Sequence, residues 1–236
     1  MGEPGGRSVL SLVASKNTRE AAYRVLKPLR ETVVQAIGDK RVVIKANVGC
    51  PQGDHRHECT DVEQLRGILD FLKPIHDQQV VMAEGAAAQA CSVRLGYERY
   101  GYLPLEKEYN VKLVDSNDLP VTRTWIRAGQ NFPRPIHIID LFLDHDVYLI
   151  SACRLKTSGD VIVTLSVKNV VIGAQTPSGS GSMNFAKPGR RVDIRGARRR
   201  RHARRGQPSL TCTFRAGRSA FKRLTIRVKL RNRIAP

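Results

Sequence analysis

The segment Arg41-Val-Val-Ile-Lys-Ala-Asn47 decides the fold. Its three consecutive β-branched residues, Val42 to Ile44, are typical of a strand that is covered on both faces, as in a parallel sheet. Helical patterns separate several of the predicted strands, and helices that alternate with strands at this spacing build βαβ units. We therefore predict an α/β fold whose mostly parallel sheet lies between flanking helices in three layers. The other predicted strands are 8–14, 80–83, 111–115, 121–126 and 146–152.

Residues that favour helix ends predict where helices begin and end between these strands. Asn17 can cap a helix that Pro28 interrupts and Gly38 ends. Thr60-Asp-Val-Glu63 has the spacing of a capping box, in which the first side chain accepts from the third helical amide and the glutamate reaches back. The stretch 161–172 has the composition of a strand, but its valines also share one helical face, and we expect a helix there.

The charge of the chain is concentrated in its last segment. Of the 40 Lys and Arg residues, 18 lie in residues 183–236 together with a single acid, Asp193, whereas residues 1–182 hold 22 basic and 20 acidic residues. We therefore predict an α/β domain over 1–182 and a basic tail over 183–236. The composition of 177–182 is that of a flexible linker.

Within the predicted tail, the arginine-rich run 190–205 has too few apolar residues to bury and is expected to stay solvated. Apolar residues alternate with polar ones after it, around Phe214 and again around Ile226. This pattern predicts two strands of a hairpin, which would be only marginally stable by itself.

The cysteines and the N-terminal residues indicate the cellular compartment of the protein. Five cysteines are an odd number in a chain that is long enough to build a core, which indicates reduced thiols rather than a disulfide framework. Residues 1–7 lack the apolar core of a signal peptide, and no apolar run reaches the roughly 18 residues of a membrane span. We expect a cytoplasmic protein without a membrane partner.

Lysine and amide side chains recur at the predicted carboxyl ends of strands. In open α/β sheets, ligands bind in the crevice beyond those ends. An ammonium group there can hold a phosphate or carboxylate, and an amide can orient it. We therefore predict a site for a small anionic ligand from the three lysines together, although a single lysine is more often a solvated surface residue. The predicted binding residues are Lys45, Asn47, Lys156, Thr157, Lys168 and Asn169.

Two acids, Glu84 and Asp115, also follow predicted strands. A carboxylate beside lysines can act as a general base or bind magnesium, so we predict both as catalytic residues. The alternative is that each only caps the following helix or pairs with a neighbouring lysine. No glycine-rich phosphate loop follows the strands, which argues against dinucleotides and nucleoside triphosphates.

The loop 50–59 holds four potential metal ligands within ten residues: Cys50, His55, His57 and Cys59. Thiolate and imidazole groups bind zinc or iron, so we predict a metal site, with an incidental polar loop as the alternative. The spacing is not a standard Cys-x-x-Cys pair. The chain also lacks the closely spaced cysteines of an iron–sulphur cluster motif.

Several of these segments together resemble a prokaryotic family catalogued as domain of unknown function 362. The match in order and spacing runs over about residues 8–174. It implies an α/β domain that is often found beside ferredoxin-type iron–sulphur modules, and hence a ferredoxin-like partner. The family's lysine and asparagine positions carry over to Lys45, Asn47, Lys156, Lys168 and Asn169. The segments that carry the resemblance are Val42-Val-Ile-Lys-Ala-Asn47, Thr60-Asp61, Ala83-Glu84-Gly85, Leu113-Val-Asp115, Ile150-Ser-Ala152, Leu155-Lys-Thr157 and Thr164-Leu-Ser-Val-Lys-Asn-Val-Val-Ile-Gly173.

The chain departs from this family at two places. Ser158 stands where the family usually has a histidine after Lys-Thr, which removes any proton transfer by that side chain. After Gly173 the family's acid- and glycine-bearing continuation is replaced by a segment rich in Arg, Ala, Gly and Pro. Those residues have GC-rich codons, so we hypothesise that the terminus after about residue 183 is frameshifted.

These features lead to three expectations for function. The first is binding of a small anionic ligand in a lysine-lined crevice, as part of a redox or iron–sulphur-linked enzyme. The second is a non-catalytic basic protein that binds nucleic acid through its tail, because polycations bind phosphate backbones without sequence specificity. The third is an inactive fragment of a truncated domain.

Overall fold

The computed structural model describes residues 9–49, 56–85, 92–127, 133–158, 161–175, 209–216 and 220–227. The chain divides into two compact units, Ser11–Arg190 and a second unit that joins Met1–Leu10 with Arg191–Pro236. The linker and the arginine-rich run lie outside the described residues, and the boundary after residue 182 stays a prediction.

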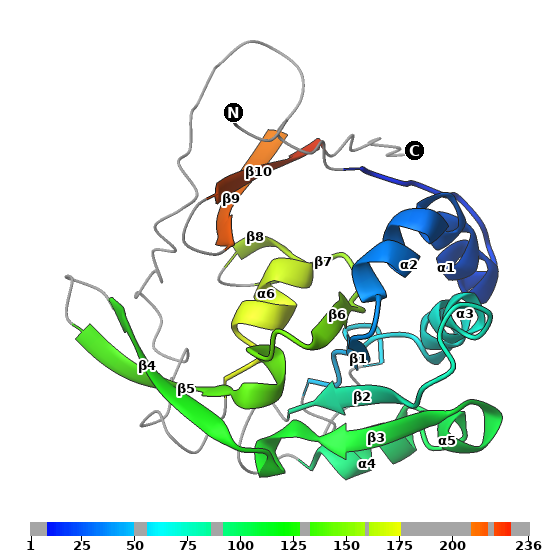
Figure 1. Ribbon diagram of the computed structural model, residues 1–236, viewed down its shortest axis with the longest axis horizontal. Helices are drawn as coiled ribbons and strands as arrows, with labels where there is room; N and C mark the ends of the chain where they lie inside the picture. Colours follow the sequence, from blue (N-terminus) through cyan, green and yellow to red (C-terminus); the bar gives the residue numbers. More distant parts are fainter. Residues whose placement is uncertain are drawn as a thin grey trace, which may run out of the picture. The chain divides into compact units, whose positions relative to one another are not determined.

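A four-stranded parallel sheet organises the first unit, in the order β3-β2-β1-β6 (Figure 1). Helices flank it, so the predicted α/β class with a mostly parallel sheet is confirmed. Its strands are β1 (Arg41–Lys45), β2 (Val80–Glu84), β3 (Val111–Asp115) and β6 (Val147–Ser151). The helices are α1 (Thr18–Leu26), α2 (Arg30–Ile37), α3 (Val62–Leu72), α4 (Val93–Arg99), α5 (Leu105–Glu108) and α6 (Ser166–Val171), with 3-10 turns η1 (Lys27–Leu29), η2 (Ser116–Asp118) and η4 (Asp140–Phe142).

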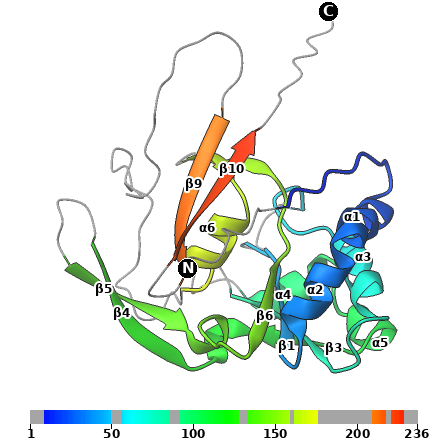
Figure 2. The ribbon, with the colours of Figure 1, turned by 45° about the horizontal axis from the view of Figure 1, so that its top comes forward.

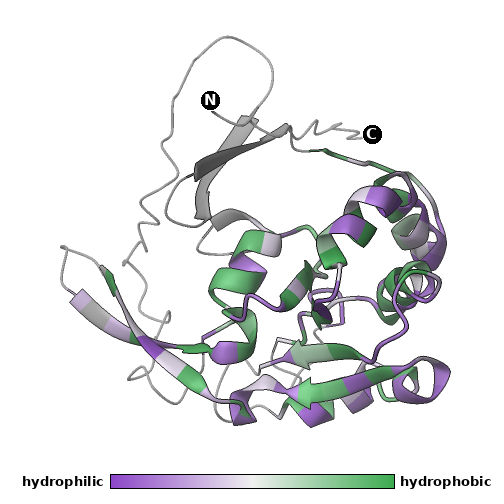
Figure 3. Ribbon diagram, viewed as in Figure 1, coloured by the Kyte–Doolittle hydropathy of each residue, from purple (hydrophilic) through white to green (hydrophobic). Residues whose placement is uncertain are grey.

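Alternation along the strands gives the sheet two different faces. Ile44 lies beside Met82 in the register, and both belong to one buried apolar cluster with residues of α1 to α5. The side chain of Lys45 points to the opposite face, where it lies against Gly173, just after α6, and near the ring of Phe142. Figure 3 shows hydrophobic and hydrophilic residues in turn along α1 and α2, as expected of helices with one face on a core.

The first helices begin and end as predicted. The Asn17 side chain caps α1 by accepting from the amide of Glu20 at 3.0 Å. Pro28 lies in the 3-10 turn η1 between α1 and α2, and α2 ends at Gly38, whose φ is +49°. In Figures 1 and 2, α1, α2 and α3 lie together beside the sheet.

Three local predictions are corrected. Residues 9–14 form no strand, and Leu12 is almost fully exposed, so the expected first strand is absent from the described part of that segment. The cap of α3 is Asp61 and not Thr60, because the Thr60 hydroxyl makes tertiary bonds instead. The ambiguous stretch after residue 160 holds both structures, β8 (Val161–Thr164) followed by α6.

Two antiparallel hairpins accompany the sheet. β4 (Val121–Arg127), which the sequence predicts, pairs with β5 (Pro133–Ile139). β7 (Lys156–Ser158) pairs with β8, which places Lys156 opposite Thr164. Neither β5 nor β7 is expected from the sequence.

The second unit contains the predicted hairpin of the tail. β9 (Ser209–Ala216) and β10 (Ala220–Arg227) pair antiparallel, with Leu224 opposite Cys212. Among the described residues, no helix has the length and apolar character required to cross a membrane.

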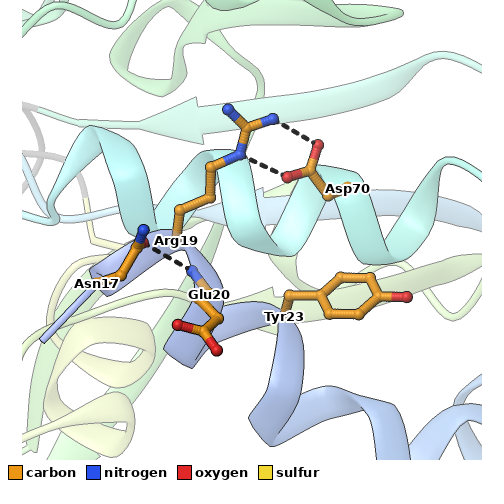
Figure 4. A pocket seen from close by; sticks show the side chains of 5 residues that line it. All are labelled: Asn17, Arg19, Glu20, Tyr23 and Asp70. Carbon is orange, nitrogen blue, oxygen red and sulfur yellow. Dashed lines mark hydrogen bonds and ion pairs between the residues drawn. The ribbon is translucent and has the colours of Figure 1, made fainter. Parts of the chain in front are cut away.

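A bidentate ion pair joins the first and third helices. Arg19 of α1 binds both carboxylate oxygens of Asp70 in α3, at 2.6 and 3.0 Å (Figure 4). Tyr109 donates to the same carboxylate at 2.8 Å. The bond from Arg19 is the main cause that lowers the pKa of Asp70 below its ordinary value of 3.8.

This pair predicts a contribution to acid stability. A carboxyl group whose pKa is depressed on folding stabilises the protein above its unfolded pKa, and this stabilisation is lost as the pH falls through the folded pKa. We expect Asp70→Asn to lower the free energy of unfolding by up to about 1 kcal/mol at pH 6 and by less at pH 3, because the pair is partly exposed. Urea unfolding at both pH values measures this, with Asp77→Asn as control. An equal loss at both pH values would contradict it.

Candidate functional site

The order of the strands places the candidate site at one rim of the sheet. From β1 the chain moves outward to β2 and β3, and later returns to pair β6 against the other side of β1. The strand order therefore reverses between β1 and β6. In open α/β sheets, the carboxyl ends of two such strands border the ligand crevice.

Backbone and side-chain bonds tie this rim together. Thr60, just before α3, donates its hydroxyl to the carbonyl of Ala152 at 2.7 Å and accepts from the amide of Asn47 at 2.9 Å. Asn169 of α6 donates its amide to the carbonyl of Lys45 at 3.2 Å and to the hydroxyl of Ser151 at 3.1 Å. The ends of β1 and β6 are thus held to α3 on one side and to α6 on the other.

The Lys45 ammonium group forms a buried ion pair with the Glu84 carboxylate at this rim. The second carboxylate oxygen of Glu84 accepts from the amide of Val48 at 3.4 Å. Burial raises the pKa of Glu84, and the charge of Lys45 acts against that rise. Because Lys45 meets a carboxylate, its charge is neutralised inside the protein and does not face solvent.

Gly173 makes the position of Lys45 possible. A Cβ atom added at Gly173 would lie 2.8 Å from both Cε and Nζ of Lys45, and 2.3 Å from the carbonyl oxygen of Asn169. Such distances are far shorter than ordinary contacts between non-bonded atoms. The glycine that ends the Lys-Asn-x-x-x-Gly segment therefore leaves the space that the lysine side chain fills.

Lys156 lies at the same rim. Its ammonium group donates to the carbonyl of Glu58 at 2.5 Å. Burial raises the pKa of both Glu84 and Cys59, and the charge of Lys156 acts against that rise. An ammonium group has three hydrogens to donate, so one bond leaves capacity for a ligand. Lys156 and Lys45 therefore share one end of the sheet, as expected, but only Lys156 is partly open to solvent.

Asp115 ends β3 directly beside Glu84 in the register. Its side chain caps the turn η2 by accepting from the amide of Asn117 at 3.0 Å. Desolvation is the main cause that raises its pKa. The capping role that was the alternative for this residue is therefore present, whereas a catalytic role stays a prediction.

Two polar atoms at the end of β3 have no hydrogen-bond partner in the described part of the chain. They are the hydroxyl of Ser116, which is fully buried, and the side-chain oxygen of Asn117. Both lie close to Gly85, where an added Cβ would be 3.1 and 2.9 Å from them. Sequence reasoning missed this pair, although the rule that led to Asp115 applies equally to the residues that follow it.

The predicted metal loop is only partly described. Cys50 and His55 lie outside the described residues, and His57 is exposed. Cys59 is buried, and its thiol donates to the carbonyl of Val48 at 2.9 Å, with burial raising its pKa. Within the described ranges no three His, Cys, Asp or Glu side chains come together to hold a metal ion, and the loop site stays a prediction.

The three remaining predicted binding residues lie in different parts of the structure. The side chain of Asn47 is partly exposed and makes no hydrogen bond to any described residue. Lys168 lies in α6 immediately before Asn169. Thr157 lies in β7, and its side chain is outside the description.

Two cavities lie away from the rim. The larger, of about 620 Å³, lies over β2 and β3 and includes Lys112 and Asp140. The smaller, of about 260 Å³, is bordered by Asn17, Glu20 and the Arg19–Asp70 pair (Figure 4). Neither contains a predicted site residue.

Residues 42–223 match the family described as domain of unknown function (DUF362). The chain belongs to this family. The DUF362 match covers β1 from Val42 onward and every rim residue named above. No curated protein and no solved structure matches the chain.

The DUF362 match differs in extent from the expected resemblance. It begins at residue 42, after α1 and α2, and it continues past residue 174 to 223, which includes part of the basic tail. The hypothesis that the terminus of this DUF362 chain is frameshifted stays a prediction.

Proposed function

We propose that the rim between β1 and β6 binds a small anionic ligand and transfers a proton to or from it. The observation that carries the proposal is the buried ion pair of Lys45 and Glu84 at the carboxyl ends of two strands. Removing two charges from water costs more free energy than their attraction returns unless the geometry is very good. Shifted pKa values and buried charges of this kind cluster at functional sites.

In this proposal the two lysines have different roles. Lys156 supplies the charge that attracts the ligand, because it is partly exposed and has hydrogens to donate. Asn47 supplies an amide on the same rim. Glu84 is the proton acceptor, since burial raises its pKa and makes its carboxylate a stronger base, and Lys45 positions it.

A redox role belongs to the same proposal through the family resemblance. A ferredoxin-like partner would be the source of electrons for a bound ligand that is reduced. The iron or zinc of the predicted loop would be held in part by Cys59, and the charge of Lys156 acts against the rise in the pKa of that thiol.

The proposal is tested by calorimetric titration of the full chain with inorganic phosphate at fixed ionic strength. Lys156→Gln is expected to weaken binding about tenfold or more, because a hydrogen bond to a charged group contributes about 1.5–3 kcal/mol. The matched control is Lys107→Gln in α5, which removes the same charge before the amino end of β3. Equal affinities of the two variants would show that Lys156 does not hold the phosphate, and the proposal would fail.

A further inference from the structure

A second binding surface lies on the β4–β5 hairpin. We propose that its outer face, formed by Arg123 and Trp125, binds single-stranded nucleic acid by stacking a base on the indole ring. Trp125 is the only tryptophan of the chain, and 58% of it is exposed. The guanidinium group of Arg123 lies 4.9 Å from the ring centroid, which is within the range of a cation–π contact.

The hairpin carries charge of one sign. Residues 119–139 contain three arginines and one histidine and not a single acid, although Asp118 and Asp140 border them on either side. Arg123 is exposed on β4 and has His137 opposite it on β5. A positively charged surface without acidic residues is complementary in charge to a polyanion.

The two faces of the hairpin differ in exposure. Val121, Arg123 and Trp125 share one face of β4 and are exposed. On the other face Thr122 is also exposed, near the start of the strand, whereas Thr124 and Ile126 are partly buried. The pairing partner of Thr124, Ile136, is 4% exposed. Arg123 and Trp125 therefore share the solvent side, while the other side of the hairpin packs inward.

The hairpin is fixed to the rest of its unit at its base. The amide of Ile139 donates to the carbonyl of Ala174 at 2.9 Å, and Ile138 forms a bridge with Gln175. The amide of Asp140 donates to the carbonyl of Pro120 at 2.9 Å. Figures 1 and 2 show β4 and β5 side by side as a two-stranded ribbon, and these bonds connect that ribbon to the rest of its unit.

These features favour a single-stranded nucleic acid, with its unpaired bases, over other polyanions. Proteins that bind single strands combine positive charge along the backbone with aromatic rings on which bases stack. Bases of a duplex are already stacked on their neighbours, and an acidic peptide offers no flat ring to the exposed indole. Trp125 is therefore explained best by a single strand.

Because Trp125 is the only tryptophan, its fluorescence reports on this surface alone, whatever the basic tail binds. We would titrate the full chain with hexathymidylate in about 0.15 M salt and follow tryptophan emission. Saturable quenching is expected, with a dissociation constant of about 10⁻⁴–10⁻⁶ M. Arg123→Gln is expected to weaken the quenching transition about three- to tenfold and to reduce the slope of log K against log salt by about 0.7, whereas Arg94→Gln on α4 leaves both unchanged.

Three results would overturn the proposal. In the first, fluorescein-labelled hexathymidylate binds by anisotropy while the emission of Trp125 stays constant, so that the strand lies elsewhere on the chain. In the second, polyglutamate of equal charge quenches Trp125 as strongly as the oligonucleotide does, so that the surface recognises acidic chains without stacking. Equal weakening by Arg123→Gln and Arg94→Gln would also contradict it.

Discussion

Replacing Glu84 with glutamine will destabilise the protein by about 3–5 kcal/mol, because it leaves the Lys45 ammonium group buried without a counter-charge. That loss is a large part of the 5–15 kcal/mol that separates folded and unfolded states of an ordinary domain. Urea unfolding followed by circular dichroism measures it. We expect little folded Glu84→Gln protein at 37 °C.

The opposite single variant should behave differently with pH. In Lys45→Met, the remaining Glu84 carboxyl can stay neutral by holding its proton, since burial raises its pKa. An acid whose folded pKa is raised stabilises the protein at low pH, and this stabilisation is lost as the pH rises above the unfolded value near 4.5. Lys45→Met should therefore be markedly less stable at pH 8 than at pH 5.

The double variant Lys45→Met with Glu84→Gln is the control for both. It removes the two charges together, so most of the stability lost in Glu84→Gln should return. In the proposed function it would still lack the proton acceptor, which separates folding from activity. A double variant as unstable as Glu84→Gln alone would show that the charge of the pair is not the cause.

Gly67→Ala is expected to have the second largest effect, a destabilisation of about 1–3 kcal/mol. Gly67 lies in α3 against α1, where an added Cβ would be 2.3 Å from the carbonyl oxygen of Arg19 and 2.7 Å from the Cβ of Ala22. An exposed helical glycine would instead gain about 1 kcal/mol on replacement by alanine. At Gly67 the contact with the Arg19 carbonyl oxygen makes the change in stability unfavourable, because a backbone oxygen cannot rotate away.

The measurement is the free energy of unfolding in urea, with Gln64→Ala in the same helix as control. Adding Ala22→Gly to Gly67→Ala removes the smaller of the two contacts and leaves the Arg19 carbonyl in place. The second substitution should therefore not restore stability. Its full recovery, or a Gly67→Ala protein as stable as the Gln64→Ala control, would contradict the packing argument.

Membership of the DUF362 family gives the chain a place among related sequences without supplying a reaction. The proposed function therefore depends on the rim itself, where Lys156 and the Lys45–Glu84 pair lie at one end of the sheet. The hairpin surface around Trp125 is independent of that rim. Failure of either proposal in its titration leaves the other unchanged.

The sequence by itself determined the class of the fold and most of its parallel strands. In runs such as Val42 to Ile44 the side chains on both faces of the strand are apolar, so these runs predict strands that are buried on both faces. Local end signals at Asn17, Pro28 and Gly38 act through bonds within a few residues, and the structure has each of them in place. Lys45 and Glu84 follow from strand ends and lie together at one rim, whereas Asn169 reaches the same rim from α6, and the functional roles of all three stay predictions.

Tertiary contacts decided the rest, because they depend on residues distant in sequence. Thr60 fits a capping box, yet its hydroxyl bonds the carbonyl of Ala152, 92 positions away, and Asp61 takes the cap. Lys45 and Lys156 look alike in sequence, but one is buried against Glu84 and the other remains partly open. Only the fold tells which lysine can meet a ligand, because the burial of a charge is set by what the whole chain places around it.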